Sequence, residues 1–212
     1  KALYTAQFRV VRVFDLLRRC QPTAFMAIPS MYNALIQSKS AKPDDFDSLR
    51  YIVSGGEPLP DAVYEGFAER FGTRICEGFG MTETSPVTNW TLPSEERRGT
   101  VGRSLDGVEQ IVVGDDGRQM PPGEDGELLI RGDNVMQGYY KMPDETAAAI
   151  TDDGYLRTGD MARIDGDGYL SITGRIKEML IIGGENVFPR EIEEVLVRHP
   201  SVSEAAVIGV TD

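Results

Sequence analysis

The chain has 212 residues, of which 41% are hydrophobic, so it can bury a core in one large or two small domains. Its 34 acidic residues outnumber its 22 lysines and arginines, which gives a formal net charge of −12. An acidic chain without a basic cluster argues against a nucleic-acid or anionic-membrane surface. No apolar run is long enough for a transmembrane segment, and the first residues do not resemble a signal peptide, so we expect a cytoplasmic protein.

The residue types that build disulfide frameworks, zinc sites and catalytic triads are scarce. Cys20 and Cys76 lack metal-binding spacing, and His199 is the single histidine. The chain begins at Lys1 rather than at a methionine and stops at Asp212, directly after an apolar run. We therefore expect it to be an internal part of a longer protein.

The first 80 residues alternate short apolar runs with amphipathic helical patterns. Strands are predicted at residues 23–28, where we expect burial on both faces, at 51–53 and just before 77. The helices between them are predicted from the faces Val10, Val13, Phe14 and Leu17, then Met31, Tyr32 and Leu35, and then Val63, Phe67 and Phe71. This alternation is typical of a parallel α/β sheet, whose ligands bind beyond the carboxyl ends of the strands.

Two glycine-rich segments, residues 54–58 and 77–84, are predicted as loops at such strand ends. In the second, Gly78 and Gly80 permit close approach of a ligand to the backbone, and Thr82 offers a hydroxyl to an anion. Glu83 can hold a hard cation such as Mg²⁺ against that anion. A glycine-bent loop with solvated acids explains the same residues, and this segment alone does not decide between the two interpretations.

After residue 93 the pattern changes to strands separated by Asp/Gly turns, which indicates antiparallel structure. The fold class predicted is part of a parallel α/β sheet subdomain, then a small antiparallel β-barrel subdomain, then the start of a small α+β domain. These correspond to residues 1–95, 96–173 and 174–212. One helix is expected at 144–150 and another at 189–198, the latter with Ile192, Val195 and Leu196 facing inward. The turn at 165–168 matches a hairpin better than a calcium loop.

Five separated motifs occur in the order found in the adenylate-forming enzymes. They are Ser54-Gly55-Gly56-Glu57-Pro58, Gly78-Phe79-Gly80-Met81-Thr82-Glu83-Thr84, Thr158-Gly159-Asp160, Gly174-Arg175-Ile176-Lys177 and Gly183-Gly184-Glu185-Asn186. The chain therefore resembles a family that includes acyl-CoA synthetases, peptide-synthetase adenylation domains and beetle luciferases. The resemblance implies a two-step reaction, in which ATP converts a carboxylic acid to an acyl-adenylate and a thiol, usually coenzyme A, takes the acyl group.

The resemblance also implies a role for each residue of these motifs. The residues expected around the adenine are Gly56, Glu57 and Pro58 as a wall, Glu77 and Gly78 at the base edge, Phe79 stacked on the ring, and Gly80 and Met81 in the same loop. Those expected around the ribose, the phosphates and coenzyme A are Asp160 and Arg175 on the ribose, Thr82 on the α-phosphate, Glu83 on Mg²⁺, Lys177 at a catalytic hinge, and Gly184 beside the pantetheine tunnel.

Gly80 stands where acetate-using members of the family carry a bulky tryptophan, so the resemblance implies an open pocket for a medium- or long-chain fatty acid or an aryl acid. The family's phosphate loop and catalytic lysine are not among these 212 residues, and we expect the chain alone to be inactive. Two alternatives stay open, namely a peptide-synthetase adenylation domain that loads an amino acid on a carrier protein, and a non-catalytic nucleotide-binding module. The sequence does not set the oligomeric state, and a homodimer is open.

Overall fold

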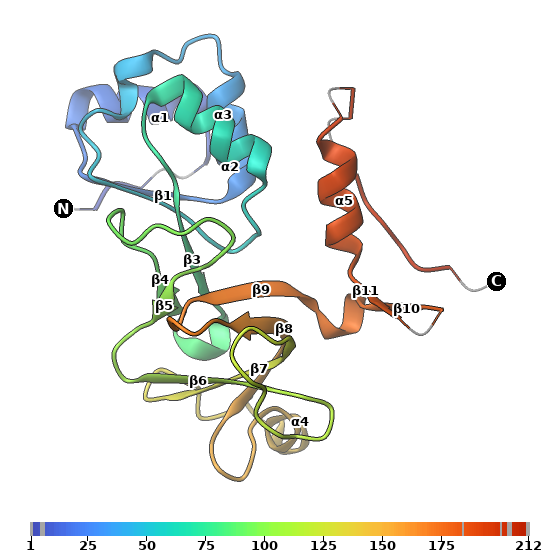
Figure 1. Cartoon of the computed structure of the whole chain (residues 1–212). Coiled ribbons are helices and arrows are strands. Elements are labelled where there is room, and N and C mark those ends of the chain that lie inside the picture. The colour runs from blue at the N-terminus through green and yellow to red at the C-terminus, as the bar shows by residue number, and fades with distance from the viewer. Residues whose placement is uncertain (1, 5–6, 184, 200, 203–204, 211–212) are drawn as a thin grey trace. The chain divides into compact units, whose positions relative to one another are not determined.

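The computed structural model describes residues 2–4, 7–183, 185–199, 201–202 and 205–210. The chain divides into two compact units (Figure 1). The first comprises Lys1–Phe79 and Thr91–Glu96, and the second comprises Gly80–Trp90 and Arg97–Asp212. Each unit contains strands and buried residues.

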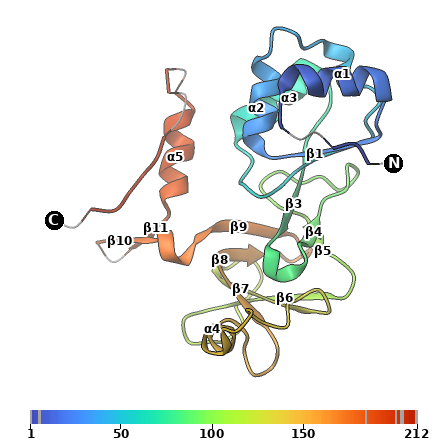
Figure 2. The ribbon, with the colours of Figure 1, turned by 180° about the vertical axis from the view of Figure 1, so that it is seen from behind.

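The first unit is built on three parallel strands. The strands are β1 (Ala24–Ala27), β2 (Tyr51–Ser54) and β3 (Cys76–Gly80), in the order β1-β2-β3. The helices are α1 (Val10–Cys20), α2 (Pro29–Gln37) and α3 (Asp61–Phe71), with a short 3₁₀ helix η1 (Pro43–Phe46). Figure 2 shows the three α-helices gathered beside β1. The predicted alternation of strands and helices is confirmed.

The core of this unit forms where the predicted apolar helix faces meet. Phe14, Tyr32, Phe46 and Phe67 are all at most 1% exposed. The ring of Phe46 lies in edge-on contact with that of Phe67, with centroids 4.8 Å apart. The Tyr32 hydroxyl donates a hydrogen bond of 2.7 Å to the carbonyl oxygen of Val53, so its polar end is satisfied inside the core.

Two predictions for the strands of this unit are wrong in detail. The β1 strand is not buried on both faces, because Phe25 and Ala27 point into the core while Met26 points the other way and is 65% exposed. Residues 77–80 are not a loop, since they belong to β3. Neither Gly78 nor Gly80 has a positive φ, so neither is a glycine because of a left-handed backbone conformation.

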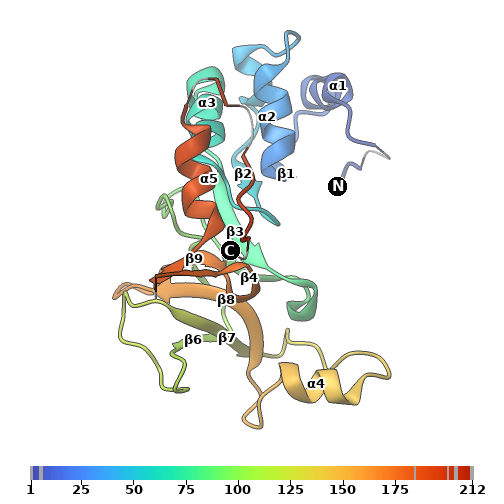
Figure 3. The ribbon, with the colours of Figure 1, turned by 90° about the vertical axis from the view of Figure 1, so that its right-hand side faces the viewer.

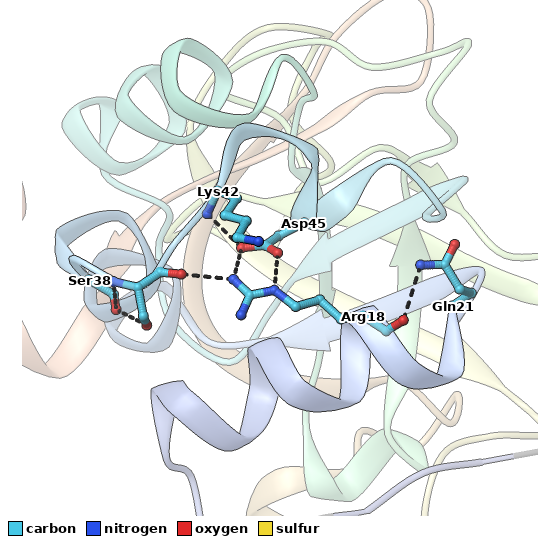
Figure 4. Close-up of polar contacts among 6 residues, drawn as sticks. Arg18, Gln21, Ser38, Lys42 and Asp45 are labelled. Carbon is cyan, nitrogen blue, oxygen red and sulfur yellow. Dashed lines mark hydrogen bonds and ion pairs between the residues drawn. The ribbon is translucent and has the colours of Figure 1, made fainter.

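An ion pair between the half-exposed Arg18 and the buried Asp45 joins α1 to η1 (Figure 4). The guanidinium of Arg18 binds Asp45 through Nε at 2.7 Å and through a terminal nitrogen at 2.9 Å, and the same terminal nitrogen donates to the carbonyl oxygen of Ser40 at 2.8 Å. The backbone N–H of Lys42 also donates to Asp45, at 2.7 Å. The Asp45 side chain is 1% exposed, so these donors replace the water that it loses on folding.

The second unit contains a four-stranded antiparallel sheet (Figure 3). Its strands β6 (Val108–Val113), β7 (Gly126–Gly132), β8 (Leu156–Ile164) and β9 (Leu170–Arg175) lie in sequence order. The antiparallel character is confirmed. Among the described strands no pairing joins β6 to β9, so the sheet is open rather than closed into the predicted barrel.

The second unit also contains shorter elements. They are the 3₁₀ helix η2 (Thr82–Thr84), β4 (Val87–Trp90), β5 (Arg103–Ser104), α4 (Pro143–Ala149), the 3₁₀ helix η3 (Ile176–Glu178), β10 (Leu180–Ile182), β11 (Glu185–Val187) and α5 (Pro189–Val197). The turn after β8 is a hairpin turn, in which Asp165 accepts the backbone N–H groups of Asp167 and Tyr169. Over the described residues, no helix has the length and apolar character that crossing a membrane requires.

The prediction that α5 turns an apolar face inward is wrong for this structure. Ile192, Val195 and Leu196 are 37%, 63% and 44% exposed. Described contacts hold the beginning of the helix, where Arg190 donates to the carbonyl oxygen of Ile172 at 3.3 Å and Phe188 packs against Gly174. Farther along, the Glu193 side chain accepts the N–H of Val207 at 2.8 Å. The amphipathic pattern is therefore present, but no described element covers its apolar side.

The ion pair of Arg18 gives a stability prediction with a matched control on the same helix. Arg18→Met removes the ion-pair partner of a buried carboxylate, whereas Arg12→Met removes one of the two arginine partners of Asp15, whose side chain is 38% exposed. We expect Arg18→Met to lower the urea midpoint several-fold more than Arg12→Met, because exposed ion pairs contribute little. Urea unfolding followed by circular dichroism measures both shifts, and equal shifts would contradict a stabilising role for the Arg18–Asp45 pair.

Candidate functional site

The segment that follows β2 forms an exposed backbone surface in the first unit. Gly56, Glu57 and Pro58 are exposed, and Gly56 has a φ of +84°, a conformation that favours glycine. Ser54 at the end of β2 is 1% exposed, and its hydroxyl has no hydrogen-bond partner among the described residues. A buried polar atom of this kind next to an open backbone surface is suited to a polar ligand.

The neighbouring strand β3 lies against this segment. Ser54 is in register with Glu77, and a Cβ on Gly55 would lie 3.2 Å from the carbonyl oxygen of Gly78. The two backbones therefore approach closely, and a side chain on Gly55 would require an adjustment of the neighbouring backbone. The structure thus brings together, within the first unit, the two segments to which the sequence assigns the adenine. Glu77, Gly78 and Phe79 are each half-buried.

Gly80 has a backbone reason to be a glycine. A Cβ at this position would lie 1.8 Å from the carbonyl oxygen of Pro86, which no backbone can accommodate unmoved. Gly80 is therefore explained by this close approach, without reference to an acyl pocket.

The η2 turn presents Thr82 and Glu83 from a fixed backbone. The fully buried hydroxyl of Thr84 accepts from the backbone N–H of Met81 at 3.1 Å and lies 2.9 Å from the carbonyl oxygen of Pro86. Thr84 thus closes the turn on itself, which leaves Thr82 exposed and Met81 and Glu83 half-buried.

Glu83 has partners that the sequence analysis missed. Its carboxylate oxygen Oε1 accepts a hydrogen bond of 3.0 Å from the Tyr139 hydroxyl, and its carbonyl oxygen accepts the N–H of Met136 at 2.7 Å. The hydrogen bond to Glu83 raises the pKa of Tyr139, so the phenol remains a donor at neutral pH. Tyr139 is 56 residues from Glu83 in the chain, and no local pattern links the two positions.

Asp160 and Arg175 face each other across β8 and β9. They are paired residues in the strand register, and Arg175 Nε lies 2.9 Å from Asp160 Oδ1. Asp160 is 2% exposed, and its other oxygen, Oδ2, has no hydrogen-bond partner among the described residues. Burial raises the pKa of Asp160 to about 6, although the charge of Arg175 opposes this shift. The site therefore holds a buried carboxylate with one acceptor oxygen available to a ligand hydroxyl.

The structure says less about the last two predicted site residues, Lys177 and Gly184. Lys177 lies in η3, two residues after Arg175, and is exposed. Gly184 lies outside the described residues, so its predicted place beside a pantetheine tunnel stays a prediction.

The part of the chain that the structure describes holds no group of three or more His, Cys, Asp or Glu residues placed for a metal ion. A protein-only metal cage is therefore absent from these residues. Mg²⁺ commonly uses one or two carboxylates together with phosphate oxygens and water. The half-buried carboxylate of Glu83 fits a cation shared with a phosphate.

Known proteins are similar to this chain in sequence and in fold. The family model described as "AMP-binding enzyme" matches residues 3–140. The sulfoacetate–CoA ligase of Cupriavidus necator is 47% identical over 77% of this chain and 32% of its own length. The long-chain-fatty-acid–CoA ligase of Escherichia coli O6:H1 is 38% identical over 89% of this chain and 34% of its own length.

Solved structures agree with the sequence relatives. The crystal structure of ATP-bound MatB from Rhodopseudomonas palustris superposes with a TM-score of 0.90 at 36% identity, over 98% of this chain and 41% of that one. The chain thus spans between about a third and two fifths of the length of the relatives that it matches. Since the family model covers more than half of the 212 residues, the chain belongs to the AMP-binding enzyme family.

Proposed function

We propose that the natural protein containing this chain is an AMP-forming acid–CoA ligase. A carboxylate oxygen of the acid bonds to the α-phosphorus of ATP as pyrophosphate leaves. The sulfur of coenzyme A then bonds to the acyl carbon as AMP leaves with the bonding electrons, and the thiol proton passes to solvent. The observation that carries the proposal is the buried Asp160 with its available oxygen opposite Arg175. The names of the relatives as CoA ligases support it.

In this proposal the chain's own residues bind and orient the nucleotide. Gly56, Glu57 and Pro58 would receive the adenine together with Glu77, Gly78 and Phe79. Asp160 would accept hydrogen bonds from the ribose hydroxyls, and Arg175 would contact the ribose or a phosphate. A hydrogen bond to a charged group contributes about 1.5–3 kcal/mol. Accurate placement matters here, because the reaction needs an aligned carboxylate and α-phosphate rather than a strong base.

The phosphate end would be held by Thr82 and Glu83, with Met81 and Gly80 in the same segment. Mg²⁺ held by Glu83 would supply charge neutralisation at the phosphates. We also propose that residues 174–212 form a mobile domain that pivots at Lys177, with Gly184 beside the path of coenzyme A. The same proposal includes the domain boundaries after residues 95 and 173.

For the acid we propose a medium- or long-chain fatty acid. The relative that acts on long-chain fatty acids, by its name, supports this choice, while the relative named for sulfoacetate represents a small charged acid. Gly80 no longer supports it independently, because the backbone of Pro86 accounts for this glycine.

The raised pKa of Asp160 gives a pH-dependent binding prediction. Ribose hydroxyls donate to the carboxylate form, so binding favours the deprotonated site and weakens as pH falls through about 6. The dissociation constant should rise by up to about tenfold per pH unit below that value. Adenosine is the suitable ligand, because the phosphate of AMP itself titrates near pH 6.

Calorimetric titration of the chain with adenosine between pH 5 and pH 8 measures this dependence. Asp160→Asn should bind adenosine weakly and without the change near pH 6, and 2′-deoxyadenosine should show a smaller change with the wild-type chain. A wild-type affinity that is constant across this range, and equal to that of Asp160→Asn, would remove Asp160 from the site.

Exchange of pyrophosphate into ATP tests the reaction itself. The natural protein should catalyse this exchange most rapidly with octanoate or palmitate, and should then form the corresponding CoA thioesters. The 212-residue chain alone should bind adenosine without exchange, because the family's phosphate loop and catalytic lysine are not among its residues. Exchange with amino acids but no CoA thioester would favour an adenylation domain instead. No exchange with fatty, aryl, sulfonated or amino acids would contradict the proposed activity and favour a non-catalytic module.

A further inference from the structure

Three hydrogen bonds connect residues 134–139 to the η2 turn. The side-chain nitrogen of Asn134 donates to the carbonyl oxygen of Thr84 at 3.0 Å. The backbone N–H of Met136 donates to the carbonyl oxygen of Glu83 at 2.7 Å. The Tyr139 hydroxyl donates to Glu83 Oε1 at 3.0 Å. The first two bonds fix the backbone of the turn, and the third fixes a side chain. Tyr139 thus acts on the orientation of the Glu83 carboxylate separately from the fold of the turn.

Tyr139 is itself held in place by α4. Its N–H donates to the hydroxyl of Thr146 at 2.9 Å, and that hydroxyl donates to the carbonyl oxygen of Met142 at 2.7 Å. The preceding Gly138 has a φ of +147°, and a Cβ there would lie 2.6 Å from the Thr146 methyl. Only glycine allows the chain to pass this closely. The hydrogen bond to Thr146 therefore holds the backbone at Tyr139. Tyr139 is 37% exposed, and this bond keeps its phenol directed toward Glu83.

A carboxylate that binds a cation has two oxygens and a low barrier to rotation. A donor that occupies Oε1 directs Oε2 toward the cation and restricts this rotation. Among the described residues, Tyr139 is the side chain that donates to Glu83. Removing the hydrogen-bonded partner of a metal ligand typically lowers metal affinity by about 10–100-fold.

We propose that Tyr139 is a positioning residue that orients Glu83 for a divalent cation carried by the nucleotide phosphates. The proposal rests on the proposed function, in which Glu83 binds that cation. Tyr139 then takes part in cation binding, and Thr146 and α4 contribute by holding Tyr139. None of these residues belongs to the five sequence motifs.

The test is Mn²⁺ binding to the natural protein in the presence of α,β-methylene-ATP, followed by the electron paramagnetic resonance signal of free Mn²⁺. We expect Tyr139→Phe to weaken Mn²⁺ binding by on the order of tenfold. Nucleotide affinity in EDTA should stay at the wild-type value, because the phenol acts on the metal ligand alone. Tyr140→Phe is the matched control, since Tyr140 is adjacent, is 85% exposed and should bind Mn²⁺ as the wild type does.

Glu83→Gln separates this inference from the proposed function. If Glu83→Gln weakens Mn²⁺ binding while Tyr139→Phe leaves it unchanged, the role of Glu83 stands and the role of Tyr139 is wrong. If Glu83→Gln leaves Mn²⁺ binding unchanged, the metal role of Glu83 is wrong, and the inference about Tyr139 falls with it.

A second variant covers the case in which Tyr139→Phe lowers the thermal unfolding midpoint. Thr146→Val keeps the shape of the side chain and removes the hydroxyl that holds the N–H of Tyr139. It should weaken Mn²⁺ binding in the same direction but by less than Tyr139→Phe. Wild-type Mn²⁺ affinity in a folded Thr146→Val protein, alongside wild-type affinity in Tyr139→Phe, would overturn the proposal.

Discussion

A buried carboxylate needs hydrogen bonds for both of its oxygens, and in the second unit Asp160 has a partner for one of them. The register of β8 and β9 places Arg175 opposite Asp160, where it binds Oδ1. Thr158, two residues earlier, accepts the backbone N–H of Asp160 at 3.0 Å and donates to the carbonyl oxygen of Leu128 at 2.8 Å. These bonds fix the position of the carboxylate while Oδ2 is left buried without a described partner. Such an arrangement is costly unless a ligand completes it.

The glycine-rich segments of the proposed site depend on a different constraint, the close approach of backbones. Gly55 lies against Gly78 in the first unit, and Gly80 lies against Pro86 in the second. These contacts explain Gly55 and Gly80 without reference to any ligand. What distinguishes the η2 turn is therefore its side chains, because Thr84 closes the turn internally while Thr82 is exposed and Glu83 is half-buried.

Sequence reasoning predicts best where local chemistry is unambiguous. The α3 helix follows from the spacing of Val63, Phe67 and Phe71 and from Gly72, which ends the helix with a φ of +67°. The strand character of residues 77–80 was not predictable in this way, because Glu-Gly-Phe-Gly lacks the β-branched residues typical of strands. The exposure of Ile192 and Val195 depends on which elements cover α5, and an amphipathic pattern does not contain that information.

In the candidate site, too, some features follow from the local sequence and others depend on the folded structure. Asp160 was assigned through its motif, yet its burial and the available oxygen are properties of the folded sheet. Tyr139 carries no motif signal, because its contact with Glu83 arises from the path of residues 134–139 and from their attachment to α4.

A crystal structure of the natural protein with bound AMP tests the role of Asp160 most directly. We expect the two ribose hydroxyls to donate to Asp160, with one of them at Oδ2, and the phosphate to lie near Thr82. A ribose bound away from Asp160, with Oδ2 still without a partner in the complex, would contradict a nucleotide-binding role for this carboxylate.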